Sequence, residues 1–148
     1  LGVVIGRRAK DVPAQSALEH VMGYTIVNDV SERAWQAERQ GQWTKGKSCD
    51  TFGPTGPWMV TKDEIPDPQA LGIWAKVNGE TRQDGNTNTM VYGPAFLVHY
   101  LSQFFTLEPG DLIWSGTMGS TRAMEPGDTY EIEISGVGTL SNKVVQGK

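Results

Sequence analysis

The sequence predicts an α+β fold in which short strands outnumber helices. Its 148 residues include 18 glycines, and glycine weakens helices while allowing the tight turns that join strands. Short apolar runs bounded by Gly, Pro, Asn and Asp indicate about eight strands, whereas helical spacing occurs in roughly two or three segments. At this length we expect one domain, which buries roughly 70% of the surface of its extended chain.

The first third of the chain is expected to alternate strands with one helix. Residues 1–5 form the branched apolar run of a buried strand. Apolar residues recur at helical spacing between residues 14 and 21, and Gly23 is placed to end that helix. A strand at 24–27 follows, and Ser31 is expected to cap a further short helix.

Strands are expected to dominate the rest of the chain. Alternating patterns and flanking turns place them at 58–61, 73–77, 81–83, 112–114, 130–134 and 139–145. The dipeptide Asn78-Gly79 predicts a tight hairpin. The clearest helix begins at Pro94 and extends to Phe104, with one apolar stripe along it.

The composition argues against several classes of partner. A formal net charge of −4 and the lack of a basic stripe disfavour binding to nucleic acid or to an anionic membrane. No apolar segment approaches the ~20 residues that a membrane span requires. Cys49 is the only cysteine, so it forms no intrachain disulfide, and we expect a reducing, cytoplasmic location.

One segment matches a nucleotide-binding pattern in letters but not in context. Gly41, Gly46, Lys47 and Ser48 fit the phosphate-loop pattern G-x-x-x-x-G-K-[ST]. A phosphate loop follows a buried strand and opens a helix, because loop amides and the helix N-terminus hold the phosphates. Here residues 32–40 are polar and helix-like, and two prolines and two glycines soon after Ser48 prevent a continuing helix. Nucleotide binding is therefore a weak alternative.

Polar side chains gather on loops that follow the predicted strands, and most of them offer oxygen atoms. These candidates are Asp29, Ser31, Arg33, Gln36, Lys47, Asp50, Thr51, Asn86, Thr87 and Thr117. His20 and His99 both lie in predicted helices, where packing is the simplest role for them, and no histidine or cysteine pair has the spacing of a zinc site. Oxygen donors with one lysine fit a hard cation such as Mg²⁺ or Mn²⁺ better.

Two longer motifs make the chain similar to a known family. Residues 28–36 read Asn-Asp-Val-Ser-Glu-Arg-Ala-Trp-Gln, and residues 46–57 read Gly-Lys-Ser-Cys-Asp-Thr-Phe-Gly-Pro-Thr-Gly-Pro. Both resemble signatures of the fumarylacetoacetate hydrolase family, at the usual distance from each other. Further matches in the family order are Val77-Asn78-Gly79-Glu80, Gln83, Thr87, Met90, Leu107-x-Pro109-Gly110-Asp111, Ser115-Gly116-Thr117 and Gly136-x-Gly138. They cover almost the whole chain.

The resemblance implies a mixed β-roll fold, a homodimer, and Mg²⁺ or Mn²⁺ held by one Asp and two Glu side chains. Asp29 matches the Asp. The two Glu normally precede a strand like residues 1–6, so we expect them upstream of Leu1, and residues 1–148 resemble the catalytic domain without its N-terminal part. Because one carboxylate rarely holds Mg²⁺, the chain by itself is expected to bind metal poorly.

The resemblance also assigns a pocket for a keto-acid substrate. Gln36, Lys47, Thr51 and Thr117 match family positions that line it. The implied substrate is a small 2,4-dioxo or 2-hydroxy-dienoic acid, and the implied reaction is hydrolysis of a carbon–carbon bond through an enolate. Lys47 would then neutralise the developing charge while Gln36 and Thr117 donate hydrogen bonds. Isomerase, decarboxylase and hydratase chemistry stay open, as does a catalytically incomplete fragment.

The chain departs from the family pattern at two places. Ala34 stands where many members carry an Asp, and residues 116–122 read Gly-Thr-Met-Gly-Ser-Thr-Arg where the family has Gly-Thr-Pro-x-Gly. The second departure weakens any assignment of the substrate. Arg122 at its end is interpreted as a solvated side chain, with a distal carboxylate of the substrate as its alternative partner. Arg33 is expected to support its loop as an ion-pair partner.

Overall fold

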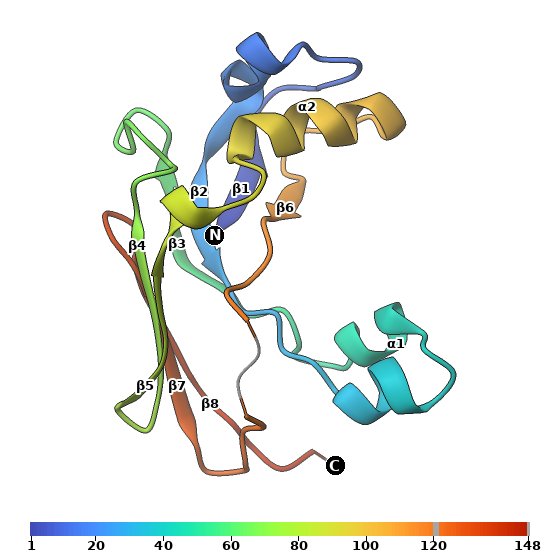
Figure 1. The fold of residues 1–148 in the computed structure, drawn as a ribbon, viewed down its shortest axis with the longest axis vertical. Helices are drawn as coiled ribbons and strands as arrows, with labels where there is room; N and C mark the ends of the chain where they lie inside the picture. The colour runs from blue at the N-terminus through green and yellow to red at the C-terminus, as the bar shows by residue number, and fades with distance from the viewer. Residues whose placement is uncertain (120–121, 148) are drawn as a thin grey trace.

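Two antiparallel sheets of four strands each make up the body of the molecule (Figure 1). This computed structural model describes residues 1–119 and 122–147. The first sheet has the order β3-β2-β1-β6 and contains β1 (Gly2–Ile5), β2 (Val21–Val27), β3 (Thr55–Thr61) and β6 (Leu112–Trp114). The second has the order β5-β4-β7-β8 and contains β4 (Gly72–Val77), β5 (Glu80–Asn86), β7 (Thr129–Ile134) and β8 (Gly138–Lys143). The predicted α+β class is confirmed.

The helices are short and lie outside the sheets. Helix α2 (Pro94–Phe104) has Pro94 in its first turn, as predicted, and helix α1 is Trp43–Lys47. Two 3₁₀ turns, Ala14–His20 and Thr87–Thr89, and one π turn, Ala34–Glu38, complete the set in the described part of the chain. None of the described helices has the length and apolar character that a membrane crossing would require.

The predicted helix over residues 14–21 is partly wrong, because only a 3₁₀ turn forms and a strand begins at Val21. Gly23 does not end a helix. It lies within β2, paired with Thr61 of β3. A Cβ atom at this position would collide with the Val60 carbonyl oxygen, so glycine here allows the close approach of the β3 backbone.

Replacing Gly23 by alanine is expected to destabilise the protein by about 1–3 kcal/mol, because the backbone of β3 must shift to accept the methyl group. Thermal or urea unfolding measures the difference. Gly147 is the matched control, since nothing lies within 4 Å of a Cβ placed there. Equal unfolding midpoints for Gly23→Ala and Gly147→Ala would contradict the packing described here.

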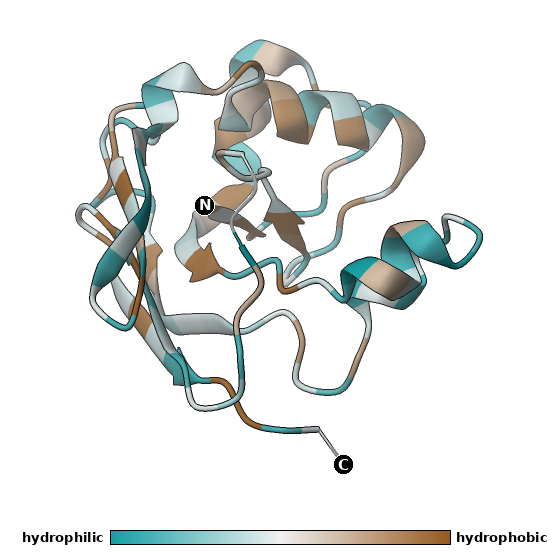
Figure 2. Ribbon diagram, turned by 60° about the horizontal axis from the view of Figure 1, so that its bottom comes forward, coloured by the Kyte–Doolittle hydropathy of each residue, from teal (hydrophilic) through white to brown (hydrophobic). Residues whose placement is uncertain are grey.

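The hydrophobic core lies between the two sheets and under α2. Alternate residues of the strands point inward, and Figure 2 shows hydrophobic positions recurring along them. The largest buried side chains include Ile5, Tyr24, Ile26 and Ile134, each at most 2% exposed. Across the sheets, Nε1 of Trp58 on β3 donates to the carbonyl oxygen of Val137 at 2.7 Å. This packing fixes the end of β2, from which the polar motif emerges.

Candidate active site

An ion pair between Asp29 and Lys47 joins the two sequence motifs. Asp29 follows the end of β2, and Lys47 is the last residue of α1. Lys47 Nζ lies 2.6 Å from Asp29 Oδ2 and donates to Ser31 Oγ at 2.7 Å. The Lys47 side chain is 24% exposed and that of Asp29 40% exposed. A lysine held this way presents a fixed positive charge at the end of a strand.

The position of Lys47 argues against a phosphate loop. Helix α1 has only five residues, and Lys47 ends it instead of opening it. Gly46 also has a different function here, because a Cβ at this position would lie 2.6 Å from Gln36 Cβ and 2.8 Å from the Glu32 carbonyl oxygen. The glycine therefore lets α1 pack on the π turn, in the lobe that projects from the sheets (Figure 1).

Gln36 lies in the π turn of this lobe, where it is buried and only half of its amide is paired. The residue is 3% exposed. Arg33 Nη1 donates to its Oε1 at 2.6 Å, while its Nε2 has no hydrogen-bond partner among the described residues. Arg33 thus bonds a neutral amide, in place of the carboxylate that its predicted ion pair required. The unpaired Nε2 is costly in a folded protein unless a ligand accepts from it.

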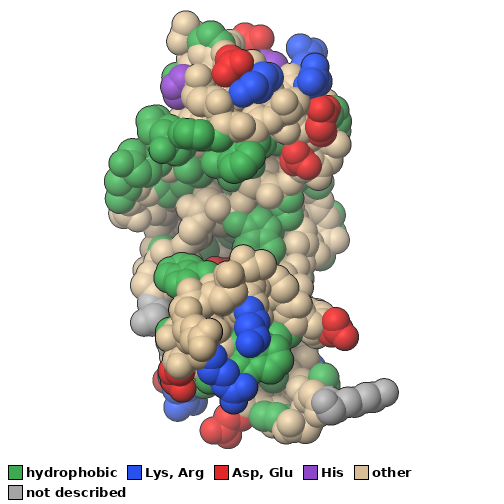
Figure 3. Space-filling model, turned by 90° about the vertical axis from the view of Figure 1, so that its right-hand side faces the viewer, with side chains coloured by type: hydrophobic (Ala, Val, Ile, Leu, Met, Phe, Trp, Pro, Cys, Tyr) green, Lys and Arg blue, Asp and Glu red, His purple; other side chains and the backbone are tan. Residues whose placement is uncertain are grey.

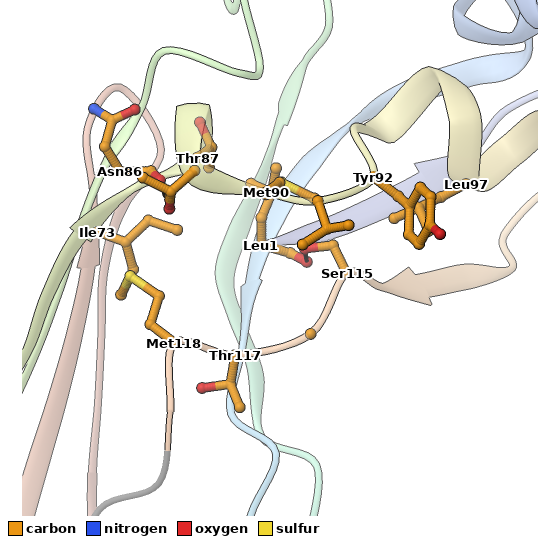
Figure 4. Close-up of a pocket in the computed structure, with 13 residues that line it drawn as sticks. Leu1, Ile73, Asn86, Thr87, Met90, Tyr92, Leu97, Ser115, Thr117 and Met118 are labelled. Atoms are coloured by element: carbon orange, nitrogen blue, oxygen red, sulfur yellow. Dashed lines mark hydrogen bonds between the residues drawn. The ribbon is translucent and has the colours of Figure 1, made fainter.

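A cavity of about 160 Å³ brings Asp29 and Thr117 together. Asn28 and Gln83 line the same space, as do apolar side chains of β4, β6 and β7. It adjoins a larger cavity of about 370 Å³, with which it shares Leu1, Ile73, Gly116, Thr117 and Met118. Figure 4 shows the larger cavity, where Asn86 and Thr87 from the polar candidates also lie.

Gln83 holds the loop that carries Thr117, and sequence reasoning did not assign it a place in the site. Its Nε2 lies 3.2 Å from Thr117 Oγ1, 2.8 Å from the Met118 carbonyl oxygen and 3.1 Å from that of Gly119. Because Gln83 donates to Thr117 Oγ1, the Thr117 hydroxyl keeps its own proton for another acceptor. Gln83 was visible as a family match on a predicted strand, but only the fold places it opposite this loop.

Thr51 does not share the cavity of Asp29 and Thr117. It has a φ of 67° and lines a separate cavity of about 190 Å³ with Tyr130. Burial raises the pKa of the Tyr130 phenol.

Arg122 lines another cavity, of about 390 Å³, together with Asp29 and Arg33. Of the loop that departs from the family pattern, residues 120 and 121 lie outside the described residues.

The described residues do not by themselves fit a divalent cation. No group of three or more His, Cys, Asp or Glu side chains within 1–119 and 122–147 is placed to hold one, and Asp29 already contacts Lys47. Both histidines contact the backbone. Nδ1 of His20 lies 3.0 Å from the Arg8 carbonyl oxygen, and Nδ1 of His99 lies 2.6 Å from the Val12 carbonyl oxygen. Packing is therefore the role that the structure supports for both.

A concave, largely apolar space with a few convergent polar groups is typical of enzymes that bind small molecules. The cavities lined by Asp29 and Thr117 have this character, so the protein is placed in this class. Comparison with known proteins makes the class specific. The chain belongs to the fumarylacetoacetate hydrolase family, because residues 1–145 match the model described as fumarylacetoacetate (FAA) hydrolase C-terminal. The resemblance inferred from the motifs is confirmed.

Individual relatives agree with this assignment. A protein of Burkholderia cenocepacia, with the general name of hydrolase, is 54% identical over 146 residues, covering 93% of this chain and 52% of its own length. The solved structure of 2-hydroxyhepta-2,4-diene-1,7-dioate isomerase from Mycobacterium marinum is 46% identical, with a TM-score of 0.92 over 99% of this chain and 57% of its own. The solved structure of maleylpyruvate hydrolase from Sphingobium sp. SYK-6 is 33% identical, with a TM-score of 0.90 over 99% of this chain and 52% of its own. The chain thus spans about half the length of the curated relatives it matches.

Proposed function

We propose that this chain carries part of the active site of an enzyme that hydrolyses a carbon–carbon bond in a small 2,4-dioxo or 2-hydroxy-dienoic acid. The observation that carries the proposal is the Asp29–Lys47 pair beside the cavity that Thr117 lines. Relatives named as a hydrolase and an isomerase of such acids support it. Isomerisation is the second candidate, because it needs the same stabilised enolate. Homodimer assembly and a cytoplasmic location stay predictions.

The side chains suit the charge changes of this reaction. Water adds to the C4 carbonyl of an acylpyruvate, the C3–C4 bond breaks, and its electron pair remains on C3 as the enolate of pyruvate, which then takes a proton. The Lys47 ammonium is suited to neutralise that enolate, and the Thr117 hydroxyl can donate to a substrate oxygen. We propose the unpaired Gln36 Nε2 as a third donor. The base that activates water is unassigned among the described residues.

A metal cofactor belongs to the proposal only with further ligands. We propose Asp29 as one ligand for Mg²⁺ or Mn²⁺, and such hard cations commonly require about six oxygen atoms. The described residues supply one carboxylate near the cavity, and Lys47 competes for it. The charge stabilisation described above is therefore assigned to the side chains of this chain alone.

Incubating the intact protein with acylpyruvates and Mg²⁺ tests the reaction. We expect one pyruvate for each substrate consumed, measured by a coupled dehydrogenase assay. Tautomer exchange without release of pyruvate would contradict the hydrolase and favour the isomerase. The corresponding reaction without protein is the control for spontaneous hydrolysis.

A further inference from the structure

Gln83 is a polar residue on the apolar inner face of the second sheet. In the ladder of this sheet Gln83 of β5 lies opposite Ala75 of β4, which lies opposite Ile132 of β7. Side chains directly opposite each other in antiparallel strands share one face, and Ile132 packs against the hydrophobic core cluster. An amide on such a face is costly unless its polar atoms are paired. The partner of Gln83 therefore has to come from outside the sheet.

That partner is the loop that follows β6. Gln83 Nε2 lies 2.8 Å from the Met118 carbonyl oxygen and 3.1 Å from the Gly119 carbonyl oxygen. It also lies 3.2 Å from Thr117 Oγ1. The amide nitrogen has two protons, so one of them is shared between two acceptors, as in other three-centre hydrogen bonds. One side chain of β5 thus holds three consecutive residues of the loop.

A second contact holds the same loop two residues further along β5. Gly85 is on the same face as Gln83, because every second residue of a strand points to one side. A Cβ at Gly85 would collide with Met118 Sδ, so the methionine side chain lies directly over the glycine backbone. Figure 4 shows Met118 reaching from the loop toward Ile73, the residue opposite Gly85 on β4. The loop is therefore held by a polar contact and by an apolar one.

The two backbone carbonyls decide which way the Gln83 amide faces. Carbonyl oxygens only accept hydrogen bonds, so the atom that faces them has to be the nitrogen. This nitrogen cannot accept the proton of the Thr117 hydroxyl, because the lone pair of an amide nitrogen is delocalised into its carbonyl group. Thr117 is thus available as a donor to a ligand in the cavity that it lines, and the ligand atom that meets it has to be an acceptor.

We propose that Gln83 is a positioning residue of the active site, which holds residues 117–119 against β5 and keeps the Thr117 hydroxyl as a donor to a substrate oxygen. A carboxylate, a keto oxygen or an enolate suits such a donor, and a 2,4-dioxo acid offers all three. The inference rests on the proposed function for the reaction, whereas the hold on the loop can be tested without turnover. Gln83 acts through Thr117 and is not itself assigned a contact with the substrate.

Replacing Gln83 by glutamate tests the polarity of the amide. The introduced carboxylate would face two carbonyl oxygens and would share its cavity with Asp29, all of which oppose its charge and raise its pKa. Only its protonated form can donate as the amide does. With the intact protein and an acylpyruvate, we expect kcat/KM of Gln83→Glu to be about 100-fold below that of the starting protein at about pH 8. The ratio of the two should recover at least about tenfold by about pH 5.

Two matched variants show whether this pH dependence belongs to the position. Gln83→Met keeps the size of the side chain but has no proton to donate, so its kcat/KM should be about 10- to 100-fold lower at every pH. Gln15→Glu adds the same carboxyl at an exposed residue of the 3₁₀ turn Ala14–His20 and should stay within about twofold of the starting protein throughout. Urea unfolding of each variant ensures that folded proteins are compared.

A double variant tests whether Gln83 acts through Thr117. Thr117→Val removes the hydroxyl and should lower kcat/KM about 10- to 100-fold. Adding Gln83→Met to Thr117→Val should lower it less than about threefold further, because the effects of residues that act as a unit are not additive. This test does not need Gln83→Glu, so it also serves if that variant fails to fold.

The methyl resonance of Met118 reports on the loop without turnover. In protein with ¹³C-labelled methionine methyl groups, this resonance is identified by its loss in Met118→Leu. We expect it to move with pH in Gln83→Glu, because the ionised carboxyl repels the Met118 carbonyl oxygen. In Gln15→Glu it should move no more than in the starting protein.

The outcomes separate the role of Gln83 from the reaction. A kcat/KM ratio for Gln83→Glu that does not change with pH, or effects of Gln83→Met and Thr117→Val that multiply, overturns the positioning role. Recovery at low pH together with a non-additive double variant supports it. If the Met118 resonance moves as expected while no acylpyruvate yields pyruvate, the hold of Gln83 on the loop stands and the proposed hydrolysis fails.

Discussion

Replacing Lys47 by methionine is expected to lower kcat/KM for acylpyruvate cleavage by about 10²–10³-fold, the usual effect of removing one group that stabilises a developing anion. Methionine keeps the length and the apolar stem of lysine but removes its charge. The main loss should be in kcat, because the enolate develops after binding. Steady-state rates of pyruvate formation by the intact protein provide the measurement.

Lys45 is the matched control for this substitution. It lies on the same short helix, but its Nζ is 5.7 Å from the centre of the Trp35 ring and it forms no ion pair with Asp29 among the described residues. Lys45→Met should therefore keep kcat/KM within about twofold. Loss of the partly exposed Lys47–Asp29 pair should cost less than about 1 kcal/mol in unfolding free energy. Equal activity in the two variants would remove Lys47 from the mechanism.

Replacing Gln36 by methionine is expected to lower activity while leaving stability nearly unchanged. The substitution removes the Oε1 that accepts from Arg33 at 2.6 Å, but it also removes the buried Nε2, which has no partner in the described part of the chain. The two effects should offset each other, so that the free energy of unfolding stays within about 1 kcal/mol of the starting protein. If Nε2 donates to the substrate, kcat/KM should fall about 10- to 100-fold. A group that is only structural would not give this combination.

The measurements for Gln36 are urea unfolding and kcat/KM on the same preparation. Gln42→Met is the control, because Gln42 accepts from the Thr44 amide at the start of α1 and lies in the same lobe. That variant should lose about 0.5–2 kcal/mol of stability as a helix cap and retain activity. If Gln36→Met instead unfolds easily and keeps full activity per folded molecule, Gln36 is a structural residue.

Local patterns in the sequence were sufficient for most strands and for the longest helix. Apolar and polar residues alternate over 73–77 and 130–134, a pattern that involves only neighbouring residues, and both segments are strands. Pro94 and the apolar stripe behind it correctly predicted α2. The segment that ends at Gly23 was predicted wrongly, because its apolar spacing fits a helix, whereas the strand that begins at Val21 pairs with β1 on one side and on the other with β3, more than thirty residues further along the chain.

Residue types and short spacings were enough to predict the family, the α+β class and the charged residues at the end of β2. Which of these residues meet could be learned only from the fold. The fold pairs Lys47 with Asp29, places Thr117 through Gln83 in the cavity that Asp29 lines, and leaves Thr51 in another. A cavity is enclosed by side chains from distant segments, and the spacing of residues along the chain does not show which strands pack together.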